Sequence, residues 1–144
     1  MPRALGSAGV AQACRDSVDA DVNAAAETAA KARMINFGQS CIAAKRFIIE
    51  EHVYEEFLEI FTRKIEGMKQ GNPLDESSDY ACMARPDLAQ ELYMQVEKSE
   101  MMGAKVILGG CKPSSGSAAF EPTILIDVPA SAPAFFEELF GPVA

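Results

Sequence analysis

Cys41 is the residue of this chain whose surroundings best suit covalent chemistry. It ends the run Asn36-Phe37-Gly38-Gln39-Ser40-Cys41, a polar turn that we expect between a helix and a strand. The glycine lets backbone N–H groups approach a ligand closely, so such a turn can supply donors to an oxyanion. A cysteine placed there can act as a nucleophile if its thiolate is stabilised. The pattern alone also fits a buried structural thiol, and both interpretations stay open at this point.

Other nucleophile or metal sites have weaker support. There is one histidine in the chain, His52, and it lies at the expected start of a helix, where a surface position is predicted. A Cys–His pair therefore has little basis. No two cysteines have the CxxC spacing, so no metal site of the zinc type is predicted. We expect free thiols in a reducing compartment for all four cysteines, which are Cys14, Cys41, Cys82 and Cys111.

Alternating helices and strands are expected to position the Cys41 turn. Asp19 or Asp21 can cap a first helix, and apolar residues that repeat at helical spacing after His52 predict an amphipathic second helix. The expected helices cover residues 19–34, 52–69 and 87–102, with one helical turn within 134–140; the expected strands cover 45–50, 105–108 and 120–128. Such alternation favours an α/β fold with some parallel pairing.

Length, charge and hydropathy exclude several classes of protein. A chain of 144 residues is enough for one domain, and 49% hydrophobic with 24% charged residues is ordinary for a globular protein. A net charge of −8 argues against nucleic acid as a partner. No apolar run is long enough for a membrane span, so no membrane partner is expected. Without a secretory signal, we expect the cytoplasm, with the mitochondrial matrix as the alternative.

Two segments of the chain resemble motifs of one enzyme family. Residues 34–50 read MINFGQSCIAAKRFIIE, which is similar to the active-site segment of the aldehyde dehydrogenase superfamily, in which Gly-Gln-x-Cys carries the nucleophile. Residues 137–142 read EELFGP, which resembles the family's Glu-x-Phe-Gly-Pro, at the distance that the family leads one to expect. The resemblance implies that Cys41 is the catalytic nucleophile. It also implies that Glu138 holds the ribose of the nicotinamide and that Phe140 packs near the nicotinamide of NAD or NADP.

The resemblance further implies a fold, a substrate class and a mechanism. Residues 19–144 would be a partial aldehyde dehydrogenase catalytic domain, of the α/β class, with helices alternating with strands of a largely parallel sheet. Residues 1–18 match nothing. The run AKRFII resembles the succinate-semialdehyde dehydrogenase branch, so the substrate is expected to be a small aldehyde, succinate semialdehyde. Cys41 would form a thiohemiacetal, then a thioester that water hydrolyses.

The sequence departs from the family pattern at the general base. The family's glutamate should lie near residues 7–10, and no glutamate precedes Glu27, which we interpret as a solvated helix position. Ala81-Cys82 also replaces the usual Gly-Pro. The chain is therefore expected to be truncated at both ends and inactive on its own.

Two alternative functions remain at this point. The chain could be a non-catalytic fragment that associates with itself or with full-length homologues through apolar surfaces. Alternatively, Cys41 could have a redox role with Cys82 or Cys111 as its resolving partner; no basic residue flanks Cys41 before Lys45, which weakens this alternative.

Overall fold

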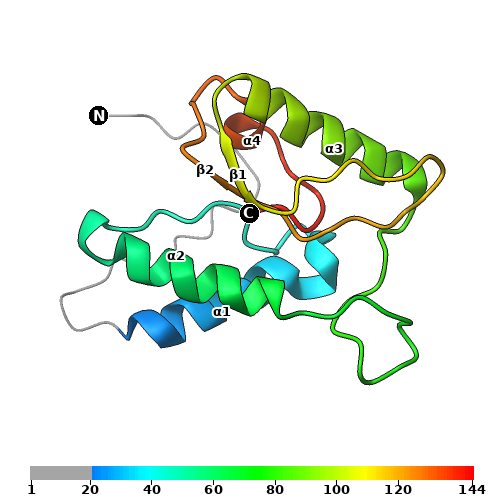
Figure 1. The fold of residues 1–144 in the computed structure, drawn as a ribbon, viewed down its shortest axis with the longest axis horizontal. Helices are drawn as coiled ribbons and strands as arrows, with labels where there is room; N and C mark the ends of the chain where they lie inside the picture. The colour runs from blue at the N-terminus through cyan, green and yellow to red at the C-terminus, as the bar shows by residue number, and fades with distance from the viewer. Residues whose placement is uncertain (1–20) are drawn as a thin grey trace.

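Helices lie on both sides of a short β-ribbon in this protein, as the computed structural model shows for the residues that it describes, 21–144 (Figure 1). The helices are α1 (Val22–Met34), α2 (Glu51–Glu66), α3 (Pro86–Met101) and α4 (Pro133–Phe136), and a 3-10 turn, η1 (Ile35–Gly38), follows α1 directly. The strands are β1 (Lys105–Leu108) and β2 (Ile124–Ile126). The combination of helices and strands agrees with the predicted α/β class.

The helices form where the sequence predicts them, and local chemistry explains their ends. The Asp21 side chain accepts a hydrogen bond of 3.0 Å from the N–H of Ala24, which caps α1. Asp19, the other predicted cap, lies outside the described residues. In α2 the buried side chains follow a helical repeat, and they are Phe57, Ile60, Phe61 and Ile65. Pro86 opens α3, where its missing N–H costs no hydrogen bond.

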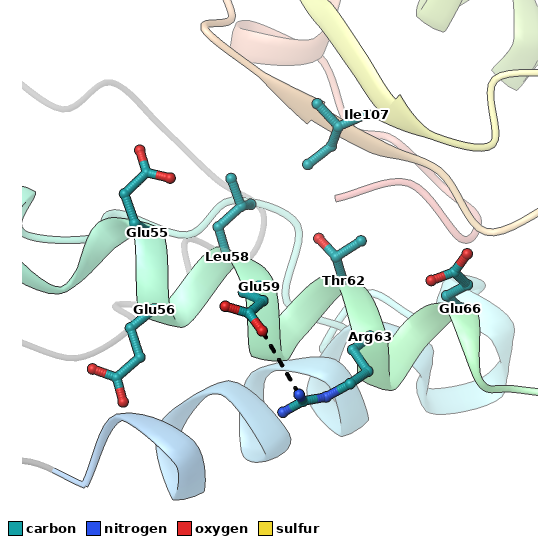
Figure 2. A pocket seen from close by; sticks show the side chains of 8 residues that line it. All are labelled: Glu55, Glu56, Leu58, Glu59, Thr62, Arg63, Glu66 and Ile107. Atoms are coloured by element: carbon teal, nitrogen blue, oxygen red, sulfur yellow. Dashed lines mark ion pairs between the residues drawn. The ribbon is translucent and has the colours of Figure 1, made fainter.

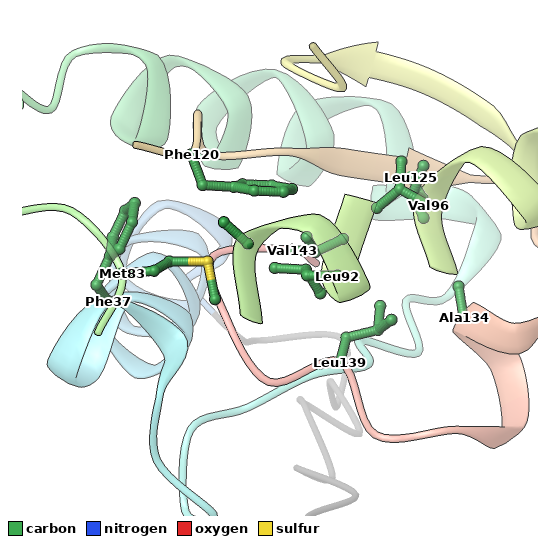
Figure 3. Close-up of a cluster of buried hydrophobic side chains, with 10 residues drawn as sticks. Phe37, Met83, Leu92, Val96, Phe120, Leu125, Ala134, Leu139 and Val143 are labelled. Atoms are coloured by element: carbon green, nitrogen blue, oxygen red, sulfur yellow. The ribbon is translucent and has the colours of Figure 1, made fainter. Parts of the chain in front are cut away.

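The β-ribbon separates two apolar cores, because neighbouring residues of a strand face opposite sides. Leu125 of β2 packs with Leu92 and Val96 of α3 in the first core (Figure 3). Ile124, the preceding residue, packs instead with α1 and α2 in the second core. One short strand therefore ties the α1–α2 layer to the layer of α3 and α4, which lies on its other side (Figure 1).

The expectation of a largely parallel sheet is wrong for the described residues. β1 and β2 pair antiparallel, with Lys105 opposite Ile126 and Val106 opposite Leu125. The connection between them, residues 109–123, contains no helix, whereas parallel neighbours need a long crossover. The predicted strand over 120–128 is also shorter, since the φ of 53° at Asp127 ends the extended run. Parallel pairing is confined, within the described part, to isolated bridges at Gln70–Tyr80 and Thr123–Val143.

The expected buried strand over residues 45–50 does not form. The segment has no strand partner among residues 21–144, and the side chain of Ile48 is 71% exposed. β-propensity alone does not create a strand, because its backbone groups need a neighbour to pair with. The apolar run therefore connects the Cys41 turn to α2 as irregular chain.

Candidate functional site

Cys41 follows the strained turn η1 by a few residues. Asn36, Phe37 and Gly38 have positive φ values of 48°, 54° and 72°, a left-handed conformation that costs energy in residues other than glycine. The ring of Phe37 stacks on that of Tyr80, with 4.4 Å between the centroids, and this packing holds the turn. The chain reverses direction here and leaves the Cys41 thiol exposed. The interpretation of Cys41 as a buried structural thiol is therefore wrong.

Gly38 packs the turn directly against the C-terminal segment of the chain. A Cβ atom at this position would collide with the carbonyl group of Gly141, so a side chain has no room here. The Gly38 carbonyl oxygen accepts a hydrogen bond of 2.9 Å from Nη2 of Arg33. Because the backbones meet without side chains between them, the two family-like segments become neighbours in space.

Lys45 connects the Cys41 turn with Glu138. Its side chain is 2% exposed, and Nζ lies 2.9 Å from Oε1 of Glu138. The same ammonium donates to the carbonyl oxygens of Ser40 and Cys41 at 3.3 Å and to that of Ala43 at 3.2 Å. A buried ammonium needs such partners, since burying an unpaired charge is costly. The structure thus places a cation four residues after the cysteine, beneath its turn.

Arg33 is a second buried cation beside the turn. A basic residue in the last turn of a helix commonly lies at the surface, where it interacts with the negative end of the helix dipole, but this side chain is fully buried. Burial lowers its pKa to about 10, while the charge of Glu138 acts in the opposite direction. Nε and Nη1 have no hydrogen-bond partner within the described range. Sequence reasoning missed this residue, because arginine is rarely fully buried.

Glu138 and Phe140 face outward because the residue between them faces inward. Leu139 is buried in the first core (Figure 3), whereas the side chain of Glu138 is 38% exposed and Phe140 is 42% exposed. Gln95 of α3 anchors the segment by donating to the Glu138 carbonyl oxygen at 3.3 Å and to Oε2 of Glu137 at 2.8 Å. The structure therefore joins Glu138 to the Cys41 turn through Lys45 and presents Phe140 on the same segment.

These side chains fit the part of a nicotinamide cofactor that the resemblance assigns to them. A carboxylate offers about four acceptor positions, so Glu138 can bind Lys45 and still accept from the hydroxyl groups of a ribose. Phe140 offers a partly exposed aromatic surface against which a planar ring can pack. A carboxylate that is joined to the Cys41 turn through Lys45 and an aromatic ring two residues after that carboxylate are thus available to such a cofactor.

The remaining candidate residues stand apart from this arrangement. Glu27 forms an ion pair with Lys64 at 2.5 Å, and the hydrogen bond from that lysine lowers its pKa, as expected for a helix-surface position. His52 is exposed, as predicted. Cys82 and Cys111 are free and exposed, and the nearby carboxylate of Glu121 raises the pKa of Cys111. Cys14 lies outside the described residues.

A hollow between α2 and Ile107 of β1 is not part of the site. Figure 2 shows side chains of α2 around it, with Ile107 of β1 facing them across the gap. Its carboxylates would repel an anionic substrate, and neither Cys41 nor Glu138 is among its lining residues, which are Glu55, Glu56, Leu58, Glu59, Thr62, Arg63, Glu66 and Ile107. Residues 21–144 also contain no cluster of metal-binding side chains and no helix long and apolar enough to cross a membrane.

Several known proteins are similar to this chain in sequence or in fold. The NAD(P)+ succinate semialdehyde dehydrogenase Sad of Escherichia coli strain K12 is 45% identical over 126 residues, which are 88% of this chain and 27% of that protein. A probable NADP+ succinate-semialdehyde dehydrogenase of Synechocystis is 42% identical over 126 residues, which are 88% of this chain and 28% of that protein. Aldehyde dehydrogenase 21 from Physcomitrella patens, solved with the reaction product succinate, has a TM-score of 0.80 and 33% identity, and the match covers 90% of this chain and 26% of that one.

The chain thus spans about a quarter of the length of these relatives. A sequence model described as the aldehyde dehydrogenase family matches residues 13–144, which include the Cys41 turn and the segment of Glu138. This match agrees with the resemblance noted in the sequence. The roles expected for Cys41 and Glu138 rest on that resemblance. The chain belongs to the aldehyde dehydrogenase family.

Proposed function

We propose that this chain carries the nucleophile for NAD(P)-dependent oxidation of an aldehyde to its carboxylic acid, with Cys41 as that nucleophile. The observation that carries the proposal is the connection made by Lys45. One ammonium binds both the carbonyl oxygen of Cys41, at 3.3 Å, and the carboxylate of Glu138, at 2.9 Å. This contact supports the proposal that the exposed thiol and the group proposed to hold the nicotinamide ribose belong to one site.

The reaction follows from the chemistry of a thiolate at this position. Sγ of Cys41 attacks the aldehyde carbon and forms a thiohemiacetal, whose oxyanion accepts a hydrogen bond from the N–H of Cys41. NAD(P)+ supplies the acceptor for the hydride that leaves this carbon. The resulting thioester is attacked by water, the S–C bond breaks, and the acid leaves as the thiolate is restored. Glu138 and Phe140 position the nicotinamide end of the cofactor.

Succinate semialdehyde is the proposed substrate, because the similar proteins from Escherichia coli and Synechocystis are named for it. Either NAD or NADP fits the proposal, since one name carries NAD(P)+ and the other NADP+. We also propose that the protein works in the cytoplasm, where the free thiols of Cys41, Cys82 and Cys111 would persist.

Acylation by p-nitrophenyl acetate tests the nucleophile without cofactor or aldehyde. A reactive thiol releases p-nitrophenolate in a burst of about one equivalent as its acetyl thioester forms. We expect the acetyl group on Cys41, mapped by mass spectrometry, and loss of the burst in Cys41→Ala. Cys82→Ala, which removes another exposed thiol, is the matched control and should keep the burst. A burst that survives Cys41→Ala and disappears in Cys82→Ala would refute the proposal.

Formation of NAD(P)H with succinate semialdehyde tests the complete reaction. No glutamate precedes Glu27, and Glu27 is engaged by Lys64, so the chain offers no evident general base. A missing general base costs about 10²–10⁴-fold in rate, and we therefore propose that the isolated chain shows no steady turnover. Turnover that depends on Cys41 would refute the proposed inactivity and leave the nucleophile intact.

A second candidate function is association with full-length relatives. Apolar side chains gathered at α4 and beside it favour this, since Phe135 is 49% and Phe136 is 60% exposed. Size-exclusion chromatography with a complete dehydrogenase should then show co-elution that Phe136→Glu abolishes. A monodisperse chain that elutes separately would exclude this candidate.

A further inference from the structure

Lys45 has more oxygen partners than an ion pair with Glu138 requires. Besides that carboxylate, its ammonium contacts the carbonyl oxygens of Ser40, Cys41 and Ala43, three residues of one turn. An ammonium carries three protons, so these four acceptors use all of its donor capacity. The residue is 3% exposed, so water cannot replace the contacts readily. Lys45 is therefore anchored by the turn as much as by the carboxylate.

The carbonyl contacts determine where the N–H groups of the turn point. In a trans peptide the C=O of one residue and the N–H of the next are directed oppositely. Because the carbonyl oxygens of Ser40 and Cys41 point to Nζ of Lys45, the N–H groups of Cys41 and Ile42 point away from it. No acceptor for either N–H exists among residues 21–144, and both residues are exposed. By contrast, the N–H groups of Ala43 and Ala44 donate to backbone carbonyls.

We infer that Lys45 is a positioning residue that holds the Cys41 turn in the form required to bind an oxyanion. It draws two carbonyl groups inward, and the N–H groups of Cys41 and Ile42 remain free as donors beside the thiol. The same ammonium keeps the Glu138 carboxylate next to the turn. The inference rests on the proposed function for its catalytic meaning, because only a substrate attacked by Cys41 would form that oxyanion.

The comparison of two reactions at the same thiol tests the inference. Acylation of Cys41 by p-nitrophenyl acetate passes through an oxyanion, whereas alkylation by iodoacetamide does not. A change in thiolate charge or exposure alters both rates, but loss of aligned N–H donors slows acylation alone. We therefore compare the ratio of the two rate constants in the chain, in Lys45→Met, which removes the donors, and in Lys45→Arg, which keeps the charge.

We expect Lys45→Met to lower the acylation-to-alkylation ratio at Cys41 about tenfold or more, since loss of one oxyanion donor costs about 10²–10³ in rate and misalignment forfeits part of that. Lys45→Arg should recover most of the ratio. Far-UV circular dichroism and the alkylation rate of Cys111, which the contact with Glu121 slows in the folded chain, report whether the fold persists. An unchanged ratio in a Lys45→Met variant that keeps its circular dichroism spectrum and its Cys111 rate would overturn the inference.

If Lys45→Met does not fold, amide hydrogen exchange of the unsubstituted chain tests whether the N–H groups of Cys41 and Ile42 are free. The N–H groups of Cys41 and Ile42 should exchange close to the rate of an unprotected peptide, and those of Ala43 and Ala44 should be protected. Protection of Cys41 and Ile42 would overturn the inference. Neither assay needs aldehyde or cofactor, so the role of Lys45 is tested independently of the proposed function. Aldehyde oxidation that survives Cys41→Ala would reject the proposed function, whereas the two assays above would still accept or reject the role of Lys45.

Discussion

Replacing Gly38 by alanine tests how the Cys41 turn is joined to the C-terminal segment. The φ of Gly38 is 72°, and an added Cβ would collide with the Gly141 carbonyl group. A non-glycine residue in the left-handed region costs about 1–2 kcal/mol, and overpacking against backbone adds about 1–3 kcal/mol. Together these give about 2–5 kcal/mol, a large part of the ~5–15 kcal/mol by which domains are stable.

Gly116→Ala is the matched control, because it separates the backbone strain from the collision. Gly116 has a φ of 73°, almost equal to that of Gly38, but no atom lies within 4 Å of an added Cβ. Alanine there should cost only about 1 kcal/mol, since the lower entropy of the unfolded chain offsets part of the strain.

Urea unfolding followed by circular dichroism measures both substitutions. With a slope of about 2 kcal/mol/M, the Gly38→Ala midpoint should fall by about 1–2.5 M and that of Gly116→Ala by about 0.5 M. Gly38→Ala should also change the rate at which Cys41 is alkylated, whereas Gly116→Ala should not. Equal midpoints for the two variants would refute the reasoning, because the close contact between Gly38 and Gly141 would then make no difference to the free energy of unfolding.

Three further measurements test the core and the charges. Leu92→Ala should lower the unfolding free energy by about 2–5 kcal/mol in urea titration, since the buried side chain leaves a cavity in the first core; a loss below about 1 kcal/mol would contradict that packing. Glu121→Gln should speed alkylation of Cys111 at pH 8, because it removes the carboxylate that raises the pKa of this thiol; an unchanged rate would contradict the pairing. The hydrogen bond from Arg85 lowers the pKa of Asp87 from 3.8 to about 2, so its contribution to stability is present above pH ~4 and is lost as the pH falls through about 2. Acid titrations of Asp87→Asn and of the unsubstituted chain should therefore diverge above pH 2 and converge below it, and parallel curves would exclude the contribution.

The sequence alone was sufficient for the helices and for the residues proposed to react. The apolar repeat of α2 predicts both the helix and its buried face, because 3.6-residue periodicity is a local property of the chain. The two family-like segments identify Cys41, Glu138 and Phe140 without any coordinates. Their roles as nucleophile and cofactor contacts stay predictions until acylation and turnover are measured.

Only the tertiary structure decided which charged residues are buried and how the strands pair. Arg33 and Lys45 are typical surface residues by type, yet both are buried. Lys45 pairs with Glu138, which lies far along the chain, and Arg33 donates to the Gly38 carbonyl oxygen, against which the Gly141 segment packs. β2 pairs antiparallel with β1, and residues 45–50 remain without a partner. A strand needs hydrogen-bond partners that are distant in sequence, and the carboxylate that pairs with Lys45 is also distant in sequence. Helix periodicity is local and readable, whereas these partners are set by the packing of the whole domain.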